Sequence, residues 1–356
     1  MSFKRVFAAM SGGVDSAAAA LLLRRAGYDV TGVTLRLHAY KDRPGLCGSA
    51  DDIETAKAVS AAMGIPHQVL DSERAVLHRR HGPLCGGICT RQDPQPLYRL
   101  QPGDQVRRSA GLGAGAGADA IATGHYARVR YDEERGRWLL LRGRDRRKDQ
   151  SYVLYQLTQH QLSHLLLPVG DYEKPDIRAL AAEAGLENAE KADSQDICFV
   201  PDGDYVGFLQ RYGGVTPVPG DFVDQEGHVL GRHRGLECYT TGQRKGLGVS
   251  ADAPLYVVRK DLDAGTVVLG PDSALYTDTL TAERVNLIPL PALTGPIQVT
   301  AKTRYSQKEA EATVEPLEGG RVRVTFAQPQ RAVTAGQAVA FYDGEAVVGG
   351  GTICGR

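Results

Sequence analysis

The chain has 356 residues, enough for two or three domains with separate hydrophobic cores rather than one. The chain has 42 basic residues (lysine plus arginine) and 42 acidic residues (aspartate plus glutamate). This balance excludes a net positive electrostatic field of the whole molecule that would steer it toward polyanions. The six cysteines are too sparse and irregular for a secreted disulfide framework, and they favour reduced thiols in a cytoplasm.

The beginning of the chain predicts neither export nor membrane insertion. Met1 leads directly into a short apolar strand pattern, without the charged region, long apolar core and cleavage site of a secretion signal. The longest apolar run, from Ala17 to Leu23, is far shorter than the roughly 20 residues that cross a bilayer. We therefore expect a soluble, cytoplasmic protein with no membrane partner.

The N-terminal part alternates strand and helix patterns. A buried strand is predicted over 5–10, a tight turn at Gly12-Gly13, a helix over 17–26 closed by Gly27, and a second strand over 29–37. A helix pattern over 51–63 ends at Gly64-Ile65-Pro66, and strand patterns follow over 67–70 and 120–123. Such alternation predicts an α/β fold with a doubly wound parallel sheet.

The texture of the sequence changes after about Tyr205 to short β-rich runs divided by glycine and proline. The runs 297–304, 321–326, 337–342 and 346–353 alternate apolar and polar residues, as the strands of a small antiparallel barrel do. We expect a nucleotide-binding catalytic domain over 1–205, a central β-rich domain that contacts RNA over 206–279, and a C-terminal β-barrel over 280–356.

The segment Ser11-Gly12-Gly13-Val14-Asp15-Ser16 lies between the first strand and the first helix. Free backbone N–H groups and the positive helix end meet there, and glycine lets the backbone approach an anion closely. The lysine of the Walker arrangement is absent. The alternative is a plain strand-to-helix turn capped by Ser16. The position after the first strand of an α/β sheet favours phosphate binding.

This loop resembles the pyrophosphatase loop of enzymes that split ATP into AMP and pyrophosphate in order to adenylate a substrate. Further blocks resemble one family of that superfamily, the bacterial tRNA-specific 2-thiouridylases, in its order and spacing: 122–126, 148–152, 193–199, 241–248 and 302–305. One block would be weak support. Together they cover nearly the whole chain.

The resemblance implies roles for three sets of residues. ATP contacts would come from Ala9, Met10, Ser11, Gly12, Gly13, Val14, Asp15, Ser16, Leu35 and Gly124. Contacts to tRNA would come from Lys148, Asp149, Gln150, Arg304 and Tyr305, with lesser ones from His125 and Gln337. Cys198 would carry the transferred sulfur as a persulfide. The implied cofactors and partners are ATP with Mg²⁺, a tRNA, and a sulfur donor protein, either a cysteine desulfurase or a sulfur-relay protein. No residue is assigned to a metal.

Local chemistry agrees with RNA contacts in two places. A cationic run, Arg142, Arg144, Arg146, Arg147 and Lys148, stands beside Gln150 and Tyr152 and suits phosphates, base edges and stacking. The pair Arg244-Lys245 combines positive charge with flanking glycines. The alternatives are a solvated charged turn for the run and an ordinary hairpin tip for the pair.

Cys198, flanked by Ile197 and Phe199, would by itself be a small buried hydrophobe. A thiol with the ordinary pKa of about 8.5 is only slightly ionised at neutral pH, so catalysis needs a cationic or helix-end environment that the sequence does not show. In the implied mechanism ATP adenylates the C2 oxygen of the wobble uridine, and sulfur on Cys198 then displaces AMP at C2. The base must be unstacked for both steps, which explains why the enzyme would need domains that bind the RNA around the site.

The second cysteine of this mechanism is missing from its expected place. In the family it belongs to a segment P-N-P-C-x-x-C-N followed by I-K-F, but 79–116 here has no convincing period and contains a glycine-alanine stretch, 110–118. Back-translating 92–106 with permitted codons and shifting the frame by one base yields R-T-P-N-P-C-I-V-C-N-R-E-I-K-F. We therefore hypothesise two compensating single-base changes, near Arg79 and near Ala116.

Other thiols and imidazoles carry weaker signals. Cys85 and Cys89 would replace the missing cysteine only if their loop refolded, and no further metal ligands cluster near them. An iron–sulfur cluster stays open for a frame-restored chain, in which C-x-x-C and Cys198 could meet. We interpret the remaining residues as structural: Cys47, Cys238, Cys354, His67, His78 and His81.

Two alternatives to a 2-thiouridylase follow from the same features. The first is another ATP-pyrophosphatase enzyme, such as a ligase that adenylates a carboxylate, which the RNA-type blocks and Cys198 argue against. The second is a tRNA-binding protein that has lost catalysis through the scrambled segment.

Overall fold

The computed structural model describes residues 4–36, 50–71, 117–191, 204, 206–207, 210 and 216–355. The chain divides into two compact units. The first contains a parallel sheet with its helices, and the second contains a small β module and an antiparallel barrel, except for Gly344–Val348 of the barrel, which belong to the first unit. In the ranges given above, no helix is long and apolar enough to cross a membrane.

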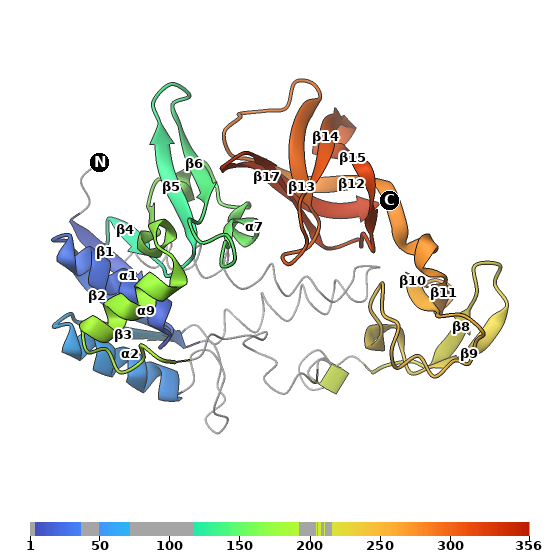
Figure 1. The fold of residues 1–356 in the computed structure, drawn as a ribbon, viewed down its shortest axis with the longest axis horizontal. Coiled ribbons are helices and arrows are strands. Elements are labelled where there is room, and N and C mark those ends of the chain that lie inside the picture. Colours follow the sequence, from blue (N-terminus) through green and yellow to red (C-terminus); the bar gives the residue numbers. More distant parts are fainter. Residues whose placement is uncertain are drawn as a thin grey trace. The chain divides into compact units, whose positions relative to one another are not determined.

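The first unit is built on a five-stranded parallel sheet with the order β3-β2-β1-β4-β7 (Figure 1). Its strands are β1 (Arg5–Ala9), β2 (Asp29–Arg36), β3 (His67–Asp71), β4 (Ala120–Ala122) and β7 (Leu165–Leu166). The chain runs outward from β1 to β3 and then returns to the other side of β1 for β4. The carboxyl ends of β1 and β4 therefore flank the switch point where doubly wound sheets bind ligands.

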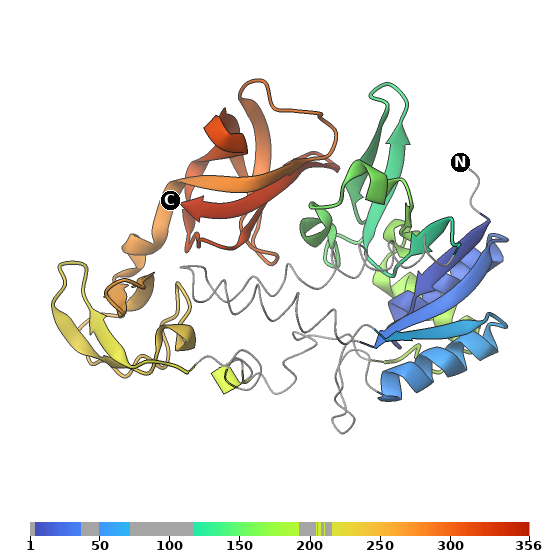
Figure 2. The same cartoon turned by 180° about the vertical axis from the view of Figure 1, so that it is seen from behind.

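Three helices pack on one face of this sheet: α1 (Val14–Arg25), α2 (Ala50–Ala62) and α9 (Lys174–Glu183). Val6 and Ala8 of β1 face these helices, whereas Phe7 packs with Val33 and Ile121 on the opposite face. This alternation is the period of two of a strand. Figure 2, from behind, shows α2 running beside β3.

Helix α1 begins three residues earlier than the predicted Ala17. Gly13 has the extended backbone of an N-cap, with φ −90° and ψ 158°, so the helix starts directly after the glycine pair. A hairpin of β5 (Ala127–Asp132) and β6 (Arg137–Arg142) follows β4. Three short helical segments come next: α7 (Ser151–Leu154), α8 (Gln159–Leu162) and η2 (Pro168–Asp171).

The small β module of the second unit has the strand order β10-β11-β8-β9. Its strands are β8 (Gly220–Val223), β9 (Val229–His233), β10 (Tyr256–Asp261) and β11 (Thr266–Gly270), with short 3-10 helices η3 (Leu236–Cys238) and η4 (Asp272–Leu275). Phe222, Tyr239 and Val257 form the centre of its core. The module has a core of its own, as the β-rich texture predicted.

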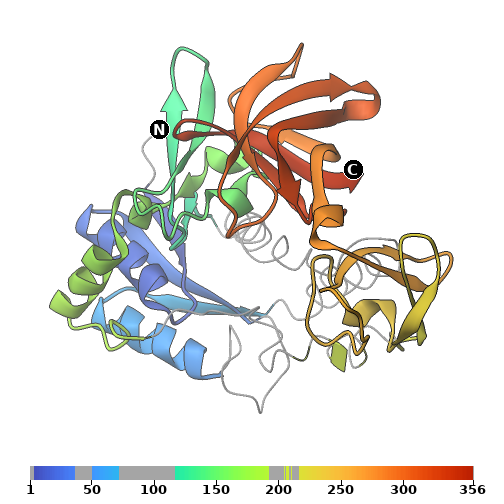
Figure 3. The same ribbon diagram turned by 45° about the vertical axis from the view of Figure 1, so that its right-hand side comes forward.

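The C-terminal barrel consists of β12 (Tyr276–Leu287), β13 (Ile297–Lys302), β14 (Ala310–Leu317), β15 (Arg321–Arg331), β16 (Ala338–Asp343) and β17 (Ala346–Gly355). A short 3-10 turn, η5 (Glu318–Gly320), joins β14 to β15. Pairing of β12 with both β15 and β17 closes the barrel (Figure 3). Val322, Val324 and Phe326 alternate with outward residues along β15. The predicted fold, a doubly wound sheet followed by two β-rich parts, is confirmed.

Candidate functional site

The loop Ser11–Ser16 lies at the switch point of the parallel sheet. Ser16 Oγ donates to the Gly13 carbonyl at 2.9 Å and accepts from the Ser11 N–H at 3.2 Å, and the Ser11 and Ser16 hydroxyl oxygens are 3.3 Å apart. Because the N–H groups of the first turn of α1 have no carbonyl four residues earlier in the helix, they are available to an anion. The two serines therefore fix a loop that suits phosphate.

Glycine is required at Gly12 and Gly124 by close packing around this loop. Gly12 has φ +75°, and a Cβ atom there would lie 2.8 Å from the Asp52 carbonyl oxygen at the start of α2. A Cβ atom on Gly124 would lie 2.6 Å from the Asp15 carbonyl carbon and from the Ser16 nitrogen. Gly12 thus packs the loop against α2, and Gly124 packs against the loop and the start of α1. The ATP contact of both glycines stays a prediction.

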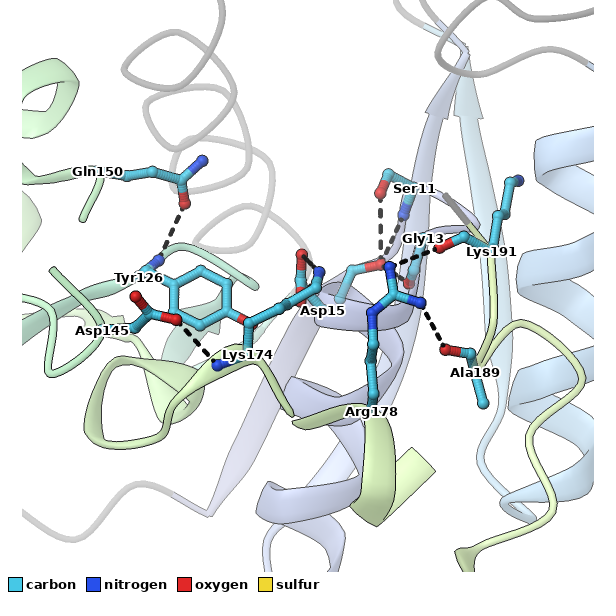
Figure 4. Close-up of polar contacts among 11 residues, drawn as sticks. Ser11, Gly13, Asp15, Tyr126, Asp145, Gln150, Lys174, Arg178, Ala189 and Lys191 are labelled. Carbon is cyan, nitrogen blue, oxygen red and sulfur yellow. Dashed lines mark hydrogen bonds and ion pairs between the residues drawn. The ribbon is translucent and has the colours of Figure 1, made fainter. Parts of the chain in front are cut away.

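Asp15 is held by two residues from distant segments (Figure 4). Lys174 Nζ lies 2.7 Å from both carboxylate oxygens of Asp15, and the Tyr126 hydroxyl donates to Oδ1 at 2.7 Å. Lys174 is only 7% exposed. Tyr126 belongs to the block 122–126, but neither contact was predicted from the sequence, because 111 and 159 residues separate Tyr126 and Lys174 from Asp15 and no local pattern links them.

Buried polar groups of β2 and α2 contact Met10, the residue before the loop. The Thr34 hydroxyl donates to the Met10 carbonyl at 2.8 Å and lies 2.9 Å from His67 Nε2. Ser60 Oγ donates to the Ala56 carbonyl at 2.7 Å and lies 3.1 Å from the Met10 sulfur. Desolvation lowers the pKa of His67, with Lys57 a smaller cause. A neutral His67 in this position agrees with its predicted structural role. Leu35, a predicted ATP contact, is the β2 residue that follows Thr34.

A third contact to the loop comes from the segment after α9. The Asn188 side chain is 3% exposed and donates to the Gly12 carbonyl at 3.2 Å, while Lys191 forms a 2.8 Å ion pair with Asp52. Arg178 of α9 donates to the carbonyls of Ala189 and Lys191 at 3.3 and 3.2 Å (Figure 4). The sequence had not singled out these residues.

The predicted RNA-contact group 148–150 forms the turn before α7. Asp149 is buried, and its carboxylate accepts from the N–H groups of Gly143 and Ser151 and from the Ser151 hydroxyl, at 3.0, 3.1 and 2.9 Å. Gln150 Oε1 accepts from the Tyr126 N–H at 2.9 Å. Asp149 therefore shapes the turn, and its contact with tRNA stays a prediction.

The cationic run beside this turn is not uniform. Arg142 is buried and donates through Nε to the Gly344 carbonyl at 2.9 Å, so its role is structural. Arg144, Arg146 and Arg147 are exposed, and Arg146 pairs with Glu345. The interpretation of the run as RNA-facing fits these three arginines better than Arg142.

His125 follows Gly124 and is a half-buried residue. Its Nδ1 lies 2.8 Å from the Thr123 hydroxyl, and burial lowers the pKa of the ring to about 4. The imidazole is therefore neutral near pH 7. Any contact with tRNA is a hydrogen bond rather than an ion pair with phosphate.

The remaining predicted RNA contacts lie in the barrel. Arg304 donates to the Ala332 carbonyl at 2.9 Å, and the ring of Tyr305 lies under Lys302 Nζ at 5.7 Å. Gln337 is 6% exposed, and its backbone carbonyl accepts from the Ile353 N–H at 2.9 Å. Arg304 and Tyr305 follow the end of β13, and Gln337 precedes β16, which pairs with β13.

The block 241–248 lies beside Ala332, the residue whose carbonyl accepts from Arg304. A Cβ atom on Gly242 would lie 3.2 Å from the Ala332 Cβ, and Ala332 has the positive φ of 54°. Arg244 and Lys245 are exposed on the turn that follows Gly242. Thus Ala332 touches both the Arg304 guanidinium and the Gly242 turn, two blocks that are far apart in the sequence.

Several sequence predictions lie outside the described residues: Cys47, Cys85, Cys89, Cys198, His78, His81 and the segment 79–116. Cys238 and Cys354 are free thiols, and burial is the largest cause that raises the pKa of each. Neither thiol is activated, in agreement with their predicted structural role.

Among the residues whose side chains the structure describes, Asp224, Glu226 and His228 form the one group of His, Cys, Asp and Glu side chains that could meet at a single metal ion. Asp224 already accepts from the Glu226 and His228 N–H groups at 3.0 and 2.8 Å and pairs with His228 Nδ1 at 2.9 Å. We interpret this exposed group as a turn stabilised by Asp224.

Three family models match successive parts of the chain. They are described as tRNA methyl transferase HUP domain, over 4–202, tRNA methyl transferase PRC-barrel domain, over 206–271, and aminomethyltransferase beta-barrel domain, over 277–353. These matches begin and end close to the changes in texture of the sequence.

Curated relatives match over nearly their whole length. A protein named tRNA-specific 2-thiouridylase MnmA from Acetivibrio thermocellus is 44% identical over 99% of this chain and 100% of its own. The protein of the same name from Heliobacterium modesticaldum is 48% identical over 98% and 92%. A solved 4-thiouridine synthetase–RNA complex with bound ATP is 15% identical, with a TM-score of 0.37, over 59% of this chain and 50% of its own.

Proposed function

The chain belongs to the tRNA-specific 2-thiouridylase family, and we propose how its sites carry out the ATP-dependent 2-thiolation of a tRNA uridine. The enzyme is a tRNA sulfurtransferase. The observation that carries the proposal is the loop Ser11–Ser16 at the switch point, where two serines, the start of α1 and Gly124 converge. We assign ATP to this loop, with further contacts from Ala9, Met10 and Leu35.

The first step is adenylation of the base. The C2 oxygen of the wobble uridine attacks the α-phosphorus of ATP, and the bond to the β-phosphate oxygen breaks, releasing pyrophosphate. The loop binds the departing phosphates through backbone N–H groups and the positive end of α1. Both oxygens of Asp15 are engaged by Lys174, so Mg²⁺ would be held by phosphate oxygens and the hydroxyls of Ser11 and Ser16. Bound there, it would neutralise phosphate charge.

The second step transfers sulfur from Cys198. The outer sulfur of its persulfide attacks C2, and AMP leaves with the C2 oxygen. A second cysteine thiolate attacks the Cys198 sulfur and breaks the S–S bond, which leaves a disulfide that a cellular thiol reduces. Covalent carriage divides one difficult exchange into easier ones. We assign the supply of sulfur to a donor protein and the whole reaction to the cytoplasm, where tRNA and reduced thiols coexist.

The tRNA contacts divide between two groups. The first group belongs to the first unit: His125 follows Gly124, which packs on the ATP loop, and Lys148, Asp149 and Gln150 form the turn that bonds to Tyr126. The second group, Arg304, Tyr305 and Gln337, belongs to the barrel. Cationic, amide and aromatic side chains of this kind suit phosphates, base edges and stacking. We propose three domains: 1–205 carries the ATP loop and the first group of tRNA contacts, 206–279 is a central RNA-contacting domain, and 280–356 carries the barrel contacts. The three family-model matches support this division.

A paired assay tests both steps. Pyrophosphate release should depend on a tRNA with a wobble uridine and vanish when that uridine is replaced by adenosine, which has no oxygen at C2. Cys198→Ser should keep tRNA binding and pyrophosphate release and lose thiolation. Cys238→Ser is the matched control, because burial raises the pKa of that thiol, and it should keep all three activities. Unchanged thiolation in Cys198→Ser would remove Cys198 from the mechanism.

The segment 79–116 decides whether the printed chain completes the second step. Sequencing the corresponding DNA tests the two proposed base changes, and an unshifted frame would refute them. The printed chain and a frame-restored chain should release pyrophosphate alike, but only the restored chain should incorporate sulfur. Equal sulfur incorporation would show that the missing cysteine is not needed.

A further inference from the structure

We propose that Lys174 is a positioning residue of the ATP site, which neutralises Asp15 and keeps its carboxylate away from the phosphate-binding side of α1. The inference rests on the ATP-binding role proposed above for the loop. It assigns a function to a lysine that lies outside every sequence block that pointed to the family.

The ion pair has the geometry of a tight, two-point contact. Lys174 Nζ is 2.7 Å from each carboxylate oxygen of Asp15, and Tyr126 donates a third hydrogen bond to Oδ1 at 2.7 Å. The ammonium also lies 5.9 Å from the centroid of the Tyr126 ring. Figure 4 shows Asp15 between Ser11 and Lys174, with its side chain turned toward Lys174.

The backbone at Lys174 is fixed independently of Asp15. Lys174 is the first residue of α9, and Glu173 forms a capping box with Asp176. The backbone N–H of Lys174 donates to the Asp145 carboxylate at 3.1 Å. A lysine that is 7% exposed has lost most of its hydration and needs a compensating negative charge. Asp15 provides that charge, and helix α9 holds the ammonium where the carboxylate can reach it.

A free carboxylate at this point would oppose ATP binding. Asp15 is the second residue of α1, so its charge lies at the same helix end that attracts phosphate. Successive helical residues point about 100° apart, so Ser16 turns back to Ser11 while Asp15 points toward Tyr126. Without Lys174 the charge of the carboxylate would be uncompensated and only the Tyr126 hydroxyl would hold it. The charge would then repel the triphosphate, and a carboxylate that turned toward the loop would compete for the first-turn N–H groups.

Equilibrium ATP binding to the full chain is the measurement, because it requires neither sulfur transfer nor the missing cysteine. Lys174→Met should raise the Kd for ATP by about tenfold or more, since like charges interact strongly at a partly buried site. In the Asp15→Asn background the same replacement should raise the Kd by less than about threefold, because the repelling charge is gone. Lys57→Met, in an exposed pair with Glu54, is the control and should leave the Kd unchanged.

Each result has a defined meaning. An equal effect of Lys174→Met in both backgrounds would show that Lys174 acts directly on ATP, and would overturn the positioning role. An unchanged Kd in a folded Lys174→Met protein would also overturn it. If Lys174→Met does not fold, Lys174→Gln replaces it with the same expected loss, because the charge is removed while a hydrogen bond is kept. Absence of ATP binding in the unaltered chain would refute the proposed function instead.

Discussion

Replacing Gly124 with alanine should destabilise the protein and weaken ATP binding together. The added Cβ would lie 2.6 Å from the Asp15 carbonyl carbon, 2.6 Å from the Ser16 nitrogen and 2.8 Å from the Asp15 carbonyl oxygen. Unstrained carbon contacts are roughly 3.5 Å or longer, so the overlap is about 1 Å. All three atoms are backbone atoms of the first turn of α1 and cannot rotate away.

The expected magnitude follows from that overlap. Overpacking of this kind lowers the free energy of unfolding by about 1–3 kcal/mol. The strain falls on the helix turn that is proposed to bind phosphate, so the Kd for ATP should rise by about tenfold or more. Thermal unfolding without ATP and equilibrium ATP binding measure the two effects separately.

Gly295→Ala is the matched control, because a Cβ atom there meets nothing within 4 Å and its φ is not positive. It should leave both the midpoint of unfolding and the Kd for ATP unchanged. A Gly124→Ala protein with normal unfolding but weak ATP binding would show that the glycine only admits the nucleotide. Normal values of both would refute the steric reasoning.

Two further predictions concern the predicted RNA-contact residues of the first unit. Asp149→Ala removes an acceptor of three buried hydrogen bonds and should lower the free energy of unfolding by about 1–3 kcal/mol. Asp149→Asn should lower the free energy of unfolding by less. An unchanged denaturation midpoint for Asp149→Ala would contradict the role of Asp149 in shaping the turn. Burial lowers the pKa of His125 from 6.5 to about 4, so between these values the unfolded chain binds a proton that the native chain does not. Stability should therefore fall with decreasing pH across this window, by about 1–3 kcal/mol, and denaturation at pH values above and below it should show a smaller fall for His125→Gln. His67 and His233, whose pKa values are also lowered, contribute equally to both chains, so equal falls would refute the assignment to His125.

Much of the fold was predictable because its signals are local. The alternation of strand and helix patterns up to Ala122 indicated the parallel sheet, and the alternating runs after Leu280 indicated the barrel. The strands β12 and β14 completed a barrel of which four strands had been predicted. The start of α1 was placed too late, because the N-cap role of Gly13 depends on its extended backbone rather than on helical periodicity.

The loop Ser11–Ser16 and its place after a buried strand could be predicted from neighbouring residues alone, because a glycine turn followed by a helix is a local pattern. The surroundings of that loop could not be predicted in this way. Lys174 reaches Asp15 across 159 residues, and Gly124 packs against the first turn of α1 because β4 pairs with β1. The inward orientation of Asp149 likewise depends on contacts with Gly143 and Ser151 in the folded turn. Such contacts join side chains from separate elements, and their partners are fixed by the pairing of strands and the packing of helices, which no short stretch of sequence specifies.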